Sequence, residues 1–355
     1  MEFMCDTRIV MGTGTISALK ELQIKRLLLV TDPYFVKTGK AQQVLEAAGA
    51  VENRVFDRVE PDPSVALAAE GTALVKEFKP EVLVALGGGS AMDCAKAMAY
   101  FSGGVRLVAI PTTSGSGSEV TDFAILTHGG VKHPLVDKRL RPDMAIVDSH
   151  LVAKLPPALV ADGGFDVLTH CAEAYVATGG GPFSQALAAD AFRTVLQGLR
   201  DSYSGNLTAR GAIHTAATMA GLAFTQAGLG LCHSLSHALG GRFHIPHGRL
   251  NAILLPAVMS RTPATAYACL ARKAGVEGVS DTIGARNLRT ALVGLRKAVG
   301  LPATLAQAGV APAQVRNALP ELVETAMADP CSRTHPVPVT ADLVREVLRE
   351  VMGNG

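Results

Sequence analysis

The sequence concentrates histidines in one short segment. His233 and His237 stand four residues apart in a helical pattern, and His244 and His247 follow in a stretch that contains Gly and Pro. Residues four apart share one face of a helix, so the first two imidazoles are expected to project from the same side. Imidazole is an indifferent core filler but a good ligand for divalent metals. The segment therefore favours a metal site over core packing.

A carboxylate that could share this metal lies earlier in the chain. Asp166 and His170 are also four residues apart, in the helical pattern GGFDVLTHCAEAYV. Alone, such a pair more often makes only a hydrogen bond. Combined with the histidine segment, it predicts a set of one carboxylate and three imidazoles: Asp166, His170, His233 and His247. A metal with an open coordination position would act there as a Lewis acid on a carbonyl oxygen. Three nitrogens and one oxygen suit Fe(II), Zn(II) or other first-row ions, so the residues leave the metal open.

A glycine-rich turn in the first half could bind a pyrophosphate. The segment EVLVALGGGSAMDCAK, residues 81–96, is an apolar run followed by Gly87, Gly88, Gly89 and Ser90 and then a helical pattern. Glycine lets a phosphate approach the backbone, and a helix amino terminus supplies unpaired N–H donors and partial positive charge. Such turns are also common without a ligand, and this one is not a GxGxxG.

Two further features would fit a dinucleotide. The loop PTTSGSGSEVT, residues 111–121, gathers hydroxyl side chains and glycines directly after an apolar run, where open α/β sheets bind ligands. Asp32 follows the run LLLVT, where its carboxylate could accept hydrogen bonds from ribose hydroxyls and repel a 2′-phosphate, which favours NAD over NADP. A helix cap before Pro33 is the alternative role for Asp32.

The elements that must carry these residues divide the chain in two. Apolar runs at 26–31, 55–56, 81–86 and 106–110 alternate with helical patterns at 39–48, 64–78 and 91–101, which predicts a parallel sheet covered on both faces. After Pro156 and Pro157 the strand patterns vanish and long Ala/Leu helical patterns continue to the end. We therefore expect an α/β domain at residues 1–155 and an all-helical domain at 156–355.

Composition excludes several classes of protein. The 33 Lys and Arg nearly balance the 31 Asp and Glu, so the charge pattern for nucleic-acid binding is missing. No apolar stretch is long enough to span a membrane, and no secretory signal is visible, so we expect a cytoplasmic protein. The six cysteines are scattered and form no CxxC pair, which argues against disulfides or a thiolate zinc site.

At this point the motifs resemble a known family. GGGSAMDCAKA, PTTSGSGSEVTDFA, ADGGFDVLTHCAEAYV and HSLSHALGGRFHIPHGRLNA look like the ordered signature of the iron-containing (group III) alcohol dehydrogenases, over roughly residues 8 to 350. Within that family the chain looks closest to the propanol and ethanol dehydrogenases of bacterial propanediol and ethanolamine utilisation. The resemblance implies a Rossmann-like α/β domain followed by an all-α domain, the dehydroquinate synthase-like fold.

The resemblance also assigns roles to residues. The family's metal ligands fall on the four residues that spacing suggests, and His237 matches a histidine thought to pass a proton. The family's nucleotide contacts fall on the following residues: Asp32, Gly88, Gly89, Ser90, Asp93, Thr112, Thr113, Ser116 and Lys132. One departure lies beside the ligand aspartate, where Gly163, Gly164 and Phe165 replace the Thr-Gly-Met of many relatives.

These roles imply a hydride transfer between NAD(H) and a short-chain alcohol or aldehyde, with Fe(II) as the expected metal and Zn(II) as the alternative. The resemblance further implies a homodimer or higher oligomer, and its closest members suggest residence in a microcompartment. The first rival is a glycerol-type dehydrogenase on the same fold, usually with zinc. A metal hydrolase would leave the glycine-rich turn without a role. A catalytically silent NAD-binding protein would have no use for four metal ligands.

Overall fold

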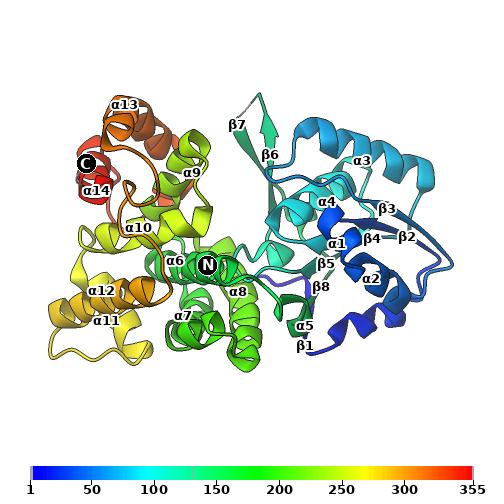
Figure 1. Cartoon of the computed structure of the whole chain (residues 1–355), viewed down its shortest axis with the longest axis horizontal. Coiled ribbons are helices and arrows are strands. Elements are labelled where there is room, and N and C mark those ends of the chain that lie inside the picture. The colour runs from blue at the N-terminus through cyan, green and yellow to red at the C-terminus, as the bar shows by residue number, and fades with distance from the viewer. Residues whose placement is uncertain (1–2, 130, 354–355) are drawn as a thin grey trace. The chain divides into compact units, whose positions relative to one another are not determined.

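The chain folds into two compact units in the computed structural model, which describes residues 3–129 and 131–353 (Figure 1). One unit comprises residues 4–154, and the other comprises the chain from Leu155 onward together with Phe3.

The first unit is built on a parallel sheet of six strands in the order β1-β8-β5-β4-β2-β3. The strands are β1 (Arg8–Gly12), β2 (Arg26–Val30), β3 (Glu52–Phe56), β4 (Val82–Gly87), β5 (Arg106–Pro111) and β8 (Met144–Asp148). The connecting helices are η1 (Thr15–Leu22), α1 (Pro33–Lys37), α2 (Lys40–Ala48), α3 (Val65–Phe78), α4 (Gly89–Phe101) and α5 (Ser149–Val152). A separate antiparallel hairpin pairs β6 (Phe123–His128) with β7 (Val131–Val136).

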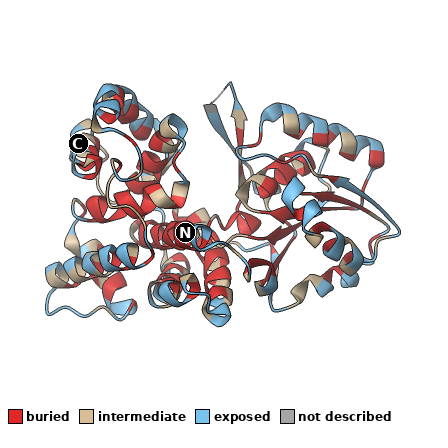
Figure 2. Ribbon diagram, in the orientation of Figure 1, coloured by how far each residue is buried: buried red, intermediate tan, exposed pale blue. Residues whose placement is uncertain are grey.

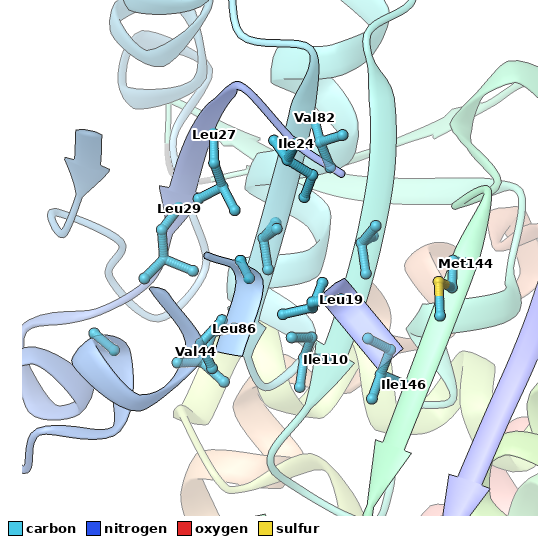
Figure 3. Close-up of a cluster of buried hydrophobic side chains, with 14 of the residues drawn as sticks. Leu19, Ile24, Leu27, Leu29, Val44, Val82, Leu86, Ile110, Met144 and Ile146 are labelled. Atoms are coloured by element: carbon cyan, nitrogen blue, oxygen red, sulfur yellow. The ribbon is translucent and has the colours of Figure 1, made fainter. Parts of the chain in front are cut away.

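Both faces of this sheet are buried, because successive side chains of each strand enter different cores. Leu27 and Leu29 of β2 pack with η1, α1 and α2, whereas Leu28 and Val30 pack with α3 and α4. The first core is shown in Figure 3, where Leu86, Ile110 and Ile146 continue it across the neighbouring strands. Strands buried on both sides read as continuous apolar runs, which is why the sequence revealed them.

The expected parallel sheet and its covering helices are confirmed, with β2 to β5 and α2 to α4 at the expected places. The sequence did not indicate β1, β8 or the β6–β7 hairpin. β1 lies at the sheet edge and is only half-buried, so its pattern is weak. The hairpin carries Lys132, His133 and Pro134, residues that strands generally disfavour.

The second unit is helical throughout its described residues. Its helices are α6 (Pro157–Val176), α7 (Pro182–Tyr203), α8 (Leu207–Ala227), α9 (Leu231–Phe243), α10 (His247–Met259), α11 (Ala264–Lys273), α12 (Asp281–Ala298), α13 (Pro312–Ala328) and α14 (Ala341–Met352), with the 3-10 turn η4 (Pro330–Thr334). This confirms the expected combination of an α/β part and an all-α part.

Helix α6 is the centre of the second unit. It packs against α7, α8 and α10, and Figure 2 shows it buried along most of its length. Pro157 at its first position has no N–H to satisfy and is preset for helical geometry, so the helix begins directly after Pro156. A buried central helix gives fixed positions to the polar side chains it carries. Among the described residues, no helix combines the length and apolarity that crossing a bilayer requires.

Candidate metal centre and nucleotide loops

The four predicted metal ligands come from three helices of the second unit. Asp166 and His170 lie on α6, His233 lies in the first turn of α9, and His247 is the first residue of α10. The Nε2 atoms of His170, His233 and His247 lie 3.9, 3.9 and 3.5 Å from Oδ1 of Asp166. Ligand atoms of Asp166, His233 and His247 all lie within 4.8 Å of one another. His170 stacks on His233, with ring centroids 4.5 Å apart.

Glu173 orients one of these histidines. It lies one turn beyond His170 on α6, and its Oε2 is 2.6 Å from Nδ1 of His233. The same carboxylate accepts hydrogen bonds from the backbone N–H groups of Gly230, Cys232 and His233. Because α9 has no side-chain cap of its own, Glu173 fills that role from another helix. Burial raises the pKa of Glu173, whereas His335 and the three backbone N–H groups oppose that shift and favour the carboxylate. A carboxylate only accepts hydrogen bonds, so in that form Nδ1 of His233 donates and Nε2 keeps its lone pair.

Burial favours the neutral form of His233. Desolvation lowers the pKa of this imidazole well below its ordinary value, and nearby His170 and His237 lower it further. A neutral imidazole is the form that binds a metal. The donor set of three imidazoles and one carboxylate therefore fits a first-row divalent cation.

Asn251 holds the carboxylate of the cluster. It lies four residues after His247 on α10, and its Nδ2 donates to Oδ1 of Asp166 at 2.8 Å. Its own Oδ1 accepts a hydrogen bond from Ser236 of α9. Asn251 is fully buried, so these contacts fix Asp166 by linking all three ligand-bearing helices.

A second polar pair lies beside the cluster. Nδ1 of His237 is 2.8 Å from Oδ2 of Asp329, which immediately precedes η4. The His237 ring stacks on His247, with centroids 5.3 Å apart. Burial is the largest single effect and raises the pKa of Asp329, but the hydrogen bond and charge of His237 together with the hydrogen bonds from Cys331 outweigh it and lower the pKa to about 2. Asp329 is therefore an ionised partner that fixes the His237 ring.

His244, the other histidine of the segment, does not join this arrangement. It ends α9 in the left-handed backbone conformation, with a φ of 55°, and it is exposed. Its role is that of a helix C-cap. The glycine after His247 matters more, because a Cβ at Gly248 would lie 1.9 Å from the carbonyl oxygen of Asp162. Only glycine allows α10 to start this close to α6.

In the first unit, the two expected nucleotide loops lie side by side. Gly88 is the N-cap of α4, and a Cβ there would lie 3.2 Å from Oγ1 of Thr113. A Cβ at Gly89 would lie 3.5 Å from the side chain of Ser116. The neighbouring Oγ1 of Thr112 is buried without a hydrogen-bond partner. Bare helix-start N–H groups beside an unsatisfied hydroxyl form a surface that suits a phosphate-bearing cofactor.

Asp93 and Lys96 of α4 hold the second loop in place. Asp93 accepts hydrogen bonds from the Ser118 hydroxyl and the Ile125 backbone N–H. Nζ of the fully buried Lys96 donates to Ser118 Oγ at 3.0 Å, to Thr121 Oγ1 at 2.8 Å and to the Phe123 carbonyl at 2.9 Å. Both oxygens of Asp93 are engaged within the protein, so its contacts here are structural.

The remaining expected nucleotide residues lie near these loops. Oδ1 of Asp32 accepts from the N–H groups of Tyr34 and Phe35 and caps α1, which is the alternative role the sequence left open. Both of these hydrogen bonds use Oδ1, and Oδ2 makes none with the described residues. Lys132 pairs with Asp62 at 2.6 Å, and the Asp62 N–H donates to the hydroxyl of Ser90. Lys132 on the β6–β7 hairpin is thus tied, through Asp62, to the start of α4.

Comparison with known proteins identifies the family. The profile of iron-containing alcohol dehydrogenases matches residues 6–149, and that of the C-terminal part of the Fe-containing alcohol dehydrogenase family matches residues 160–352. The chain therefore belongs to the iron-containing alcohol dehydrogenase family. The resemblance stated from the motifs is confirmed, and the protein is an oxidoreductase of the alcohol dehydrogenase type.

Individual relatives agree along the full chain. The chain is 38% identical to the 1-propanol dehydrogenase PduQ of Salmonella typhimurium, over 99% of both chains. It is 35% identical to an NADPH-dependent butanol dehydrogenase of Clostridium saccharobutylicum, over 98% of this chain and 97% of that one. The fold matches sulfoacetaldehyde reductase from Bifidobacterium kashiwanohense, solved in complex with NAD+, with a TM-score of 0.90, 26% identity and coverage of 100% and 99%. The family to which the chain belongs is named for iron.

Proposed function

We propose that this alcohol dehydrogenase transfers a hydride between NAD(H) and a short-chain alcohol or aldehyde, using a metal held by Asp166, His170, His233 and His247. The observation that carries the proposal is the approach of three imidazole Nε2 atoms to one oxygen of Asp166. Three imidazole groups cluster around one buried carboxylate when a cation binds among them. The cation takes up the imidazole lone pairs and balances the charge of the carboxylate.

The chain's own residues prepare this centre. Glu173 sets the tautomer of His233, and Asn251 fixes Asp166 by donating to the same Oδ1 that the three imidazoles surround. A divalent metal bound there polarises a carbonyl oxygen and stabilises the negative charge that develops during reduction. Fe(II) is the metal we propose, because the family takes its name from iron, and Zn(II) is the alternative that the same donors accept.

His237 is the proposed proton-transfer residue. Its side chain is 32% exposed, so its second nitrogen can exchange protons with solvent, while Asp329 holds Nδ1. The ionised Asp329 orients the ring through this contact. This dyad would deliver a proton to an alkoxide product and remove one in the reverse direction.

A short apolar substrate is the proposal that fits the surroundings of the ligands. Phe224 of α8 stacks on His170, with centroids 4.4 Å apart, and places an apolar ring against the cluster. Relatives named for propanol and butanol support the same choice. A glycerol-type dehydrogenase remains the second candidate on this fold, and glycerol is the substrate that distinguishes it.

NAD(H) is the proposed cofactor because Asp32, which follows β2 and caps α1, has one carboxylate oxygen outside its capping bonds. A negative charge there repels a 2′-phosphate. The relative from Clostridium saccharobutylicum is named as NADPH-dependent, so cofactor choice varies within the family. The proposed phosphate cradle consists of the glycine-rich backbone at Gly88 and Gly89 and of Thr112, Thr113 and Ser116. Ser90, Asp93 and Lys132 support this cradle.

The experiment compares NADH and NADPH oxidation with propionaldehyde, acetaldehyde and dihydroxyacetone, using anaerobically purified protein supplied with Fe(II) or Zn(II). We expect turnover with the two short aldehydes and NADH. Asp32→Asn keeps an oxygen that caps α1 but removes the charge, so the variant should gain NADPH activity without losing stability. Preference for dihydroxyacetone would favour the glycerol-type alternative, and an unchanged cofactor preference in Asp32→Asn would limit Asp32 to its capping role.

A further inference from the structure

The helical unit contains a second concave site that none of the proposed metal ligands lines. This cavity has a volume of about 780 Å³. Its walls come from the beginning of α6, the end of α7 and of α12, and residues 299–308 that follow α12. In Figure 1 these elements lie in the lower part of the helical unit. The volume matches that of sites for small organic molecules.

Hydrogen-bond donors dominate the polar lining of this cavity. Arg296, Lys297, Tyr203 and Gln307 all contribute to its wall. Oε1 of Gln307 already accepts the Ala303 N–H, so its Nε2 donors remain. No Asp or Glu occurs among the described residues that line the cavity. Arg249 also lines it, but both of its hydrogen-bonding nitrogens face Asp162, which compensates that charge.

The charges of Arg296 and Lys297 are not compensated in this way. Arg296 donates a hydrogen bond to the carbonyl of Ala252 at 3.2 Å, and no carboxylate in the described part of the chain pairs with either residue. Burial lowers the pKa of Arg296, which means that its charged form is desolvated without a matching anion. A partly buried, unpaired guanidinium is costly unless something pairs with it.

A smaller cavity continues the same basic surface. It has a volume of about 230 Å³ and shares Val293, Arg296 and Ala303 with the larger one. Arg289 joins its lining, and in α12 the positions 289, 293, 296 and 297 fall on one face. Glu350 also lines it, but this carboxylate pairs with Arg261 at 2.5 Å. One face of α12 thus presents three cations to two adjoining cavities.

We propose that this cavity binds a small organic anion that carries phosphate or carboxylate groups, with Arg296 and Lys297 as the charged contacts and Tyr203 and Gln307 as neutral donors. Guanidinium and ammonium groups form strong charge-assisted hydrogen bonds with such oxyanions. Cations near the end of α12 also interact favourably with the helix dipole. That effect explains basic residues at a helix end, but it requires neither a cavity nor donors from α7 and the following loop.

The test measures pyrophosphate binding by calorimetry to the full-length protein saturated with NADH. The protein is saturated with NADH because the glycine-rich turn of the first unit is itself a proposed phosphate site. NADH then occupies that turn and keeps pyrophosphate from binding there. Citrate in place of pyrophosphate distinguishes a carboxylate from a phosphate preference. We expect binding that persists in the presence of NADH and that weakens about tenfold or more in Lys297→Gln and in Arg296→Gln, as for loss of a charge-assisted contact.

Lys297 is exposed, so its substitution should leave folding intact, whereas Arg296 also donates to the backbone. Lys273→Gln removes an equally exposed lysine from the end of α11, outside either cavity, and should bind pyrophosphate like the parent protein. The proposal is overturned if neither anion binds when NADH is saturating, or if Lys297→Gln binds as tightly as the Lys273→Gln control. The binding measurement does not depend on the metal or on catalytic activity.

Discussion

Nδ1 of His233 lies 2.6 Å from Oε2 of Glu173, in a fully buried contact that joins α9 to α6. The carboxylate makes two structural connections at once. It caps the first turn of α9 and it determines which nitrogen of His233 carries the proton. The start of α9 and the orientation of one proposed metal ligand therefore depend on the same side chain.

We predict that Glu173→Gln lowers metal affinity by about ten- to a hundredfold. The amide can still accept backbone hydrogen bonds, but its NH2 group can donate to Nδ1 of His233. The proton of the imidazole then moves to Nε2, where it blocks coordination. Metal retained after titration with a chelator provides the measurement. Glu346→Gln, an exposed change on α14, serves as the control. Equal metal retention in both variants would contradict the orienting role.

Asp329 should affect turnover without affecting metal binding. In Asp329→Asn the amide oxygen can keep the contacts that Oδ1 makes with Cys331 N–H and Ser234, while His237 loses its charged partner. We expect kcat to fall by about ten- to a hundredfold, a typical range for impaired proton transfer, with metal content unchanged. Asp342→Asn on the exposed face of α14 is the control. A normal kcat in Asp329→Asn would remove the His237–Asp329 pair from the mechanism.

Gly248→Ala should destabilise the helical unit. The new methyl group would overlap the Asp162 carbonyl oxygen at 1.9 Å, so the start of α10 must move away from α6 and take His247 with it. Overpacking of this kind costs about 1–3 kcal/mol and lowers the melting temperature. Gly241→Ala is the matched control, because no atom lies within 4 Å of a Cβ there. Similar melting temperatures and metal contents for the two variants would show that α10 adjusts without cost.

Lys96 makes stability depend on pH in a definite direction. Burial lowers its pKa from the ordinary value of 10.5 to about 8, although Asp93, Glu119 and Asp122 oppose the shift. Between pH 8 and 10.5 the unfolded chain keeps a proton that the folded protein releases, so this group makes the free energy of unfolding rise with pH. The rise from pH 8 to 9.5 should reach about 2 kcal/mol at most.

The measurement for Lys96 is urea denaturation at pH 8 and 9.5 of the parent protein and of Lys96→Met. The variant lacks the titrating amine, so its free energy of unfolding should rise less over this interval. If both proteins show the same pH dependence, Lys96 titrates outside this window. The free energies of unfolding at the two pH values are compared within each protein. This cancels the constant effect of losing three hydrogen bonds at Ser118, Thr121 and Phe123.

Three of the buried strands were predictable because they follow one physical rule, whereas β8, which is buried along its whole length, was missed. β2, β4 and β5 are covered on both faces and therefore consist of apolar runs, whereas the edge strand β1 and the hairpin strand β7 lack that signature. The helical character of the second unit followed from its Ala/Leu patterns. Which of its helices adjoin could not be predicted, because that depends on close approaches such as Gly248 against Asp162.

The candidate site was predictable where spacing within one helix carries information. Asp166 with His170 and His233 with His237 follow the four-residue rule, and the structure brings the four proposed ligands together. The same rule could have predicted Glu173, because it falls on the helix face of Asp166 and His170. It could also have predicted Asn251, which lies four residues after His247. Asp329 had no local signal, because 92 residues separate it from His237 and only the fold joins them.

The most direct test of the central claim is the rate of NADH oxidation with propionaldehyde by anaerobically prepared protein, before and after metal removal and after Fe(II) or Zn(II) is restored. Asp166→Ala is compared with Asp190→Ala, which removes an exposed carboxylate of α7 that pairs with Arg193. We predict that activity depends on the restored metal, is abolished in Asp166→Ala and is retained in Asp190→Ala. Full activity in metal-free protein, or in Asp166→Ala, would contradict a metal-dependent hydride transfer at this site.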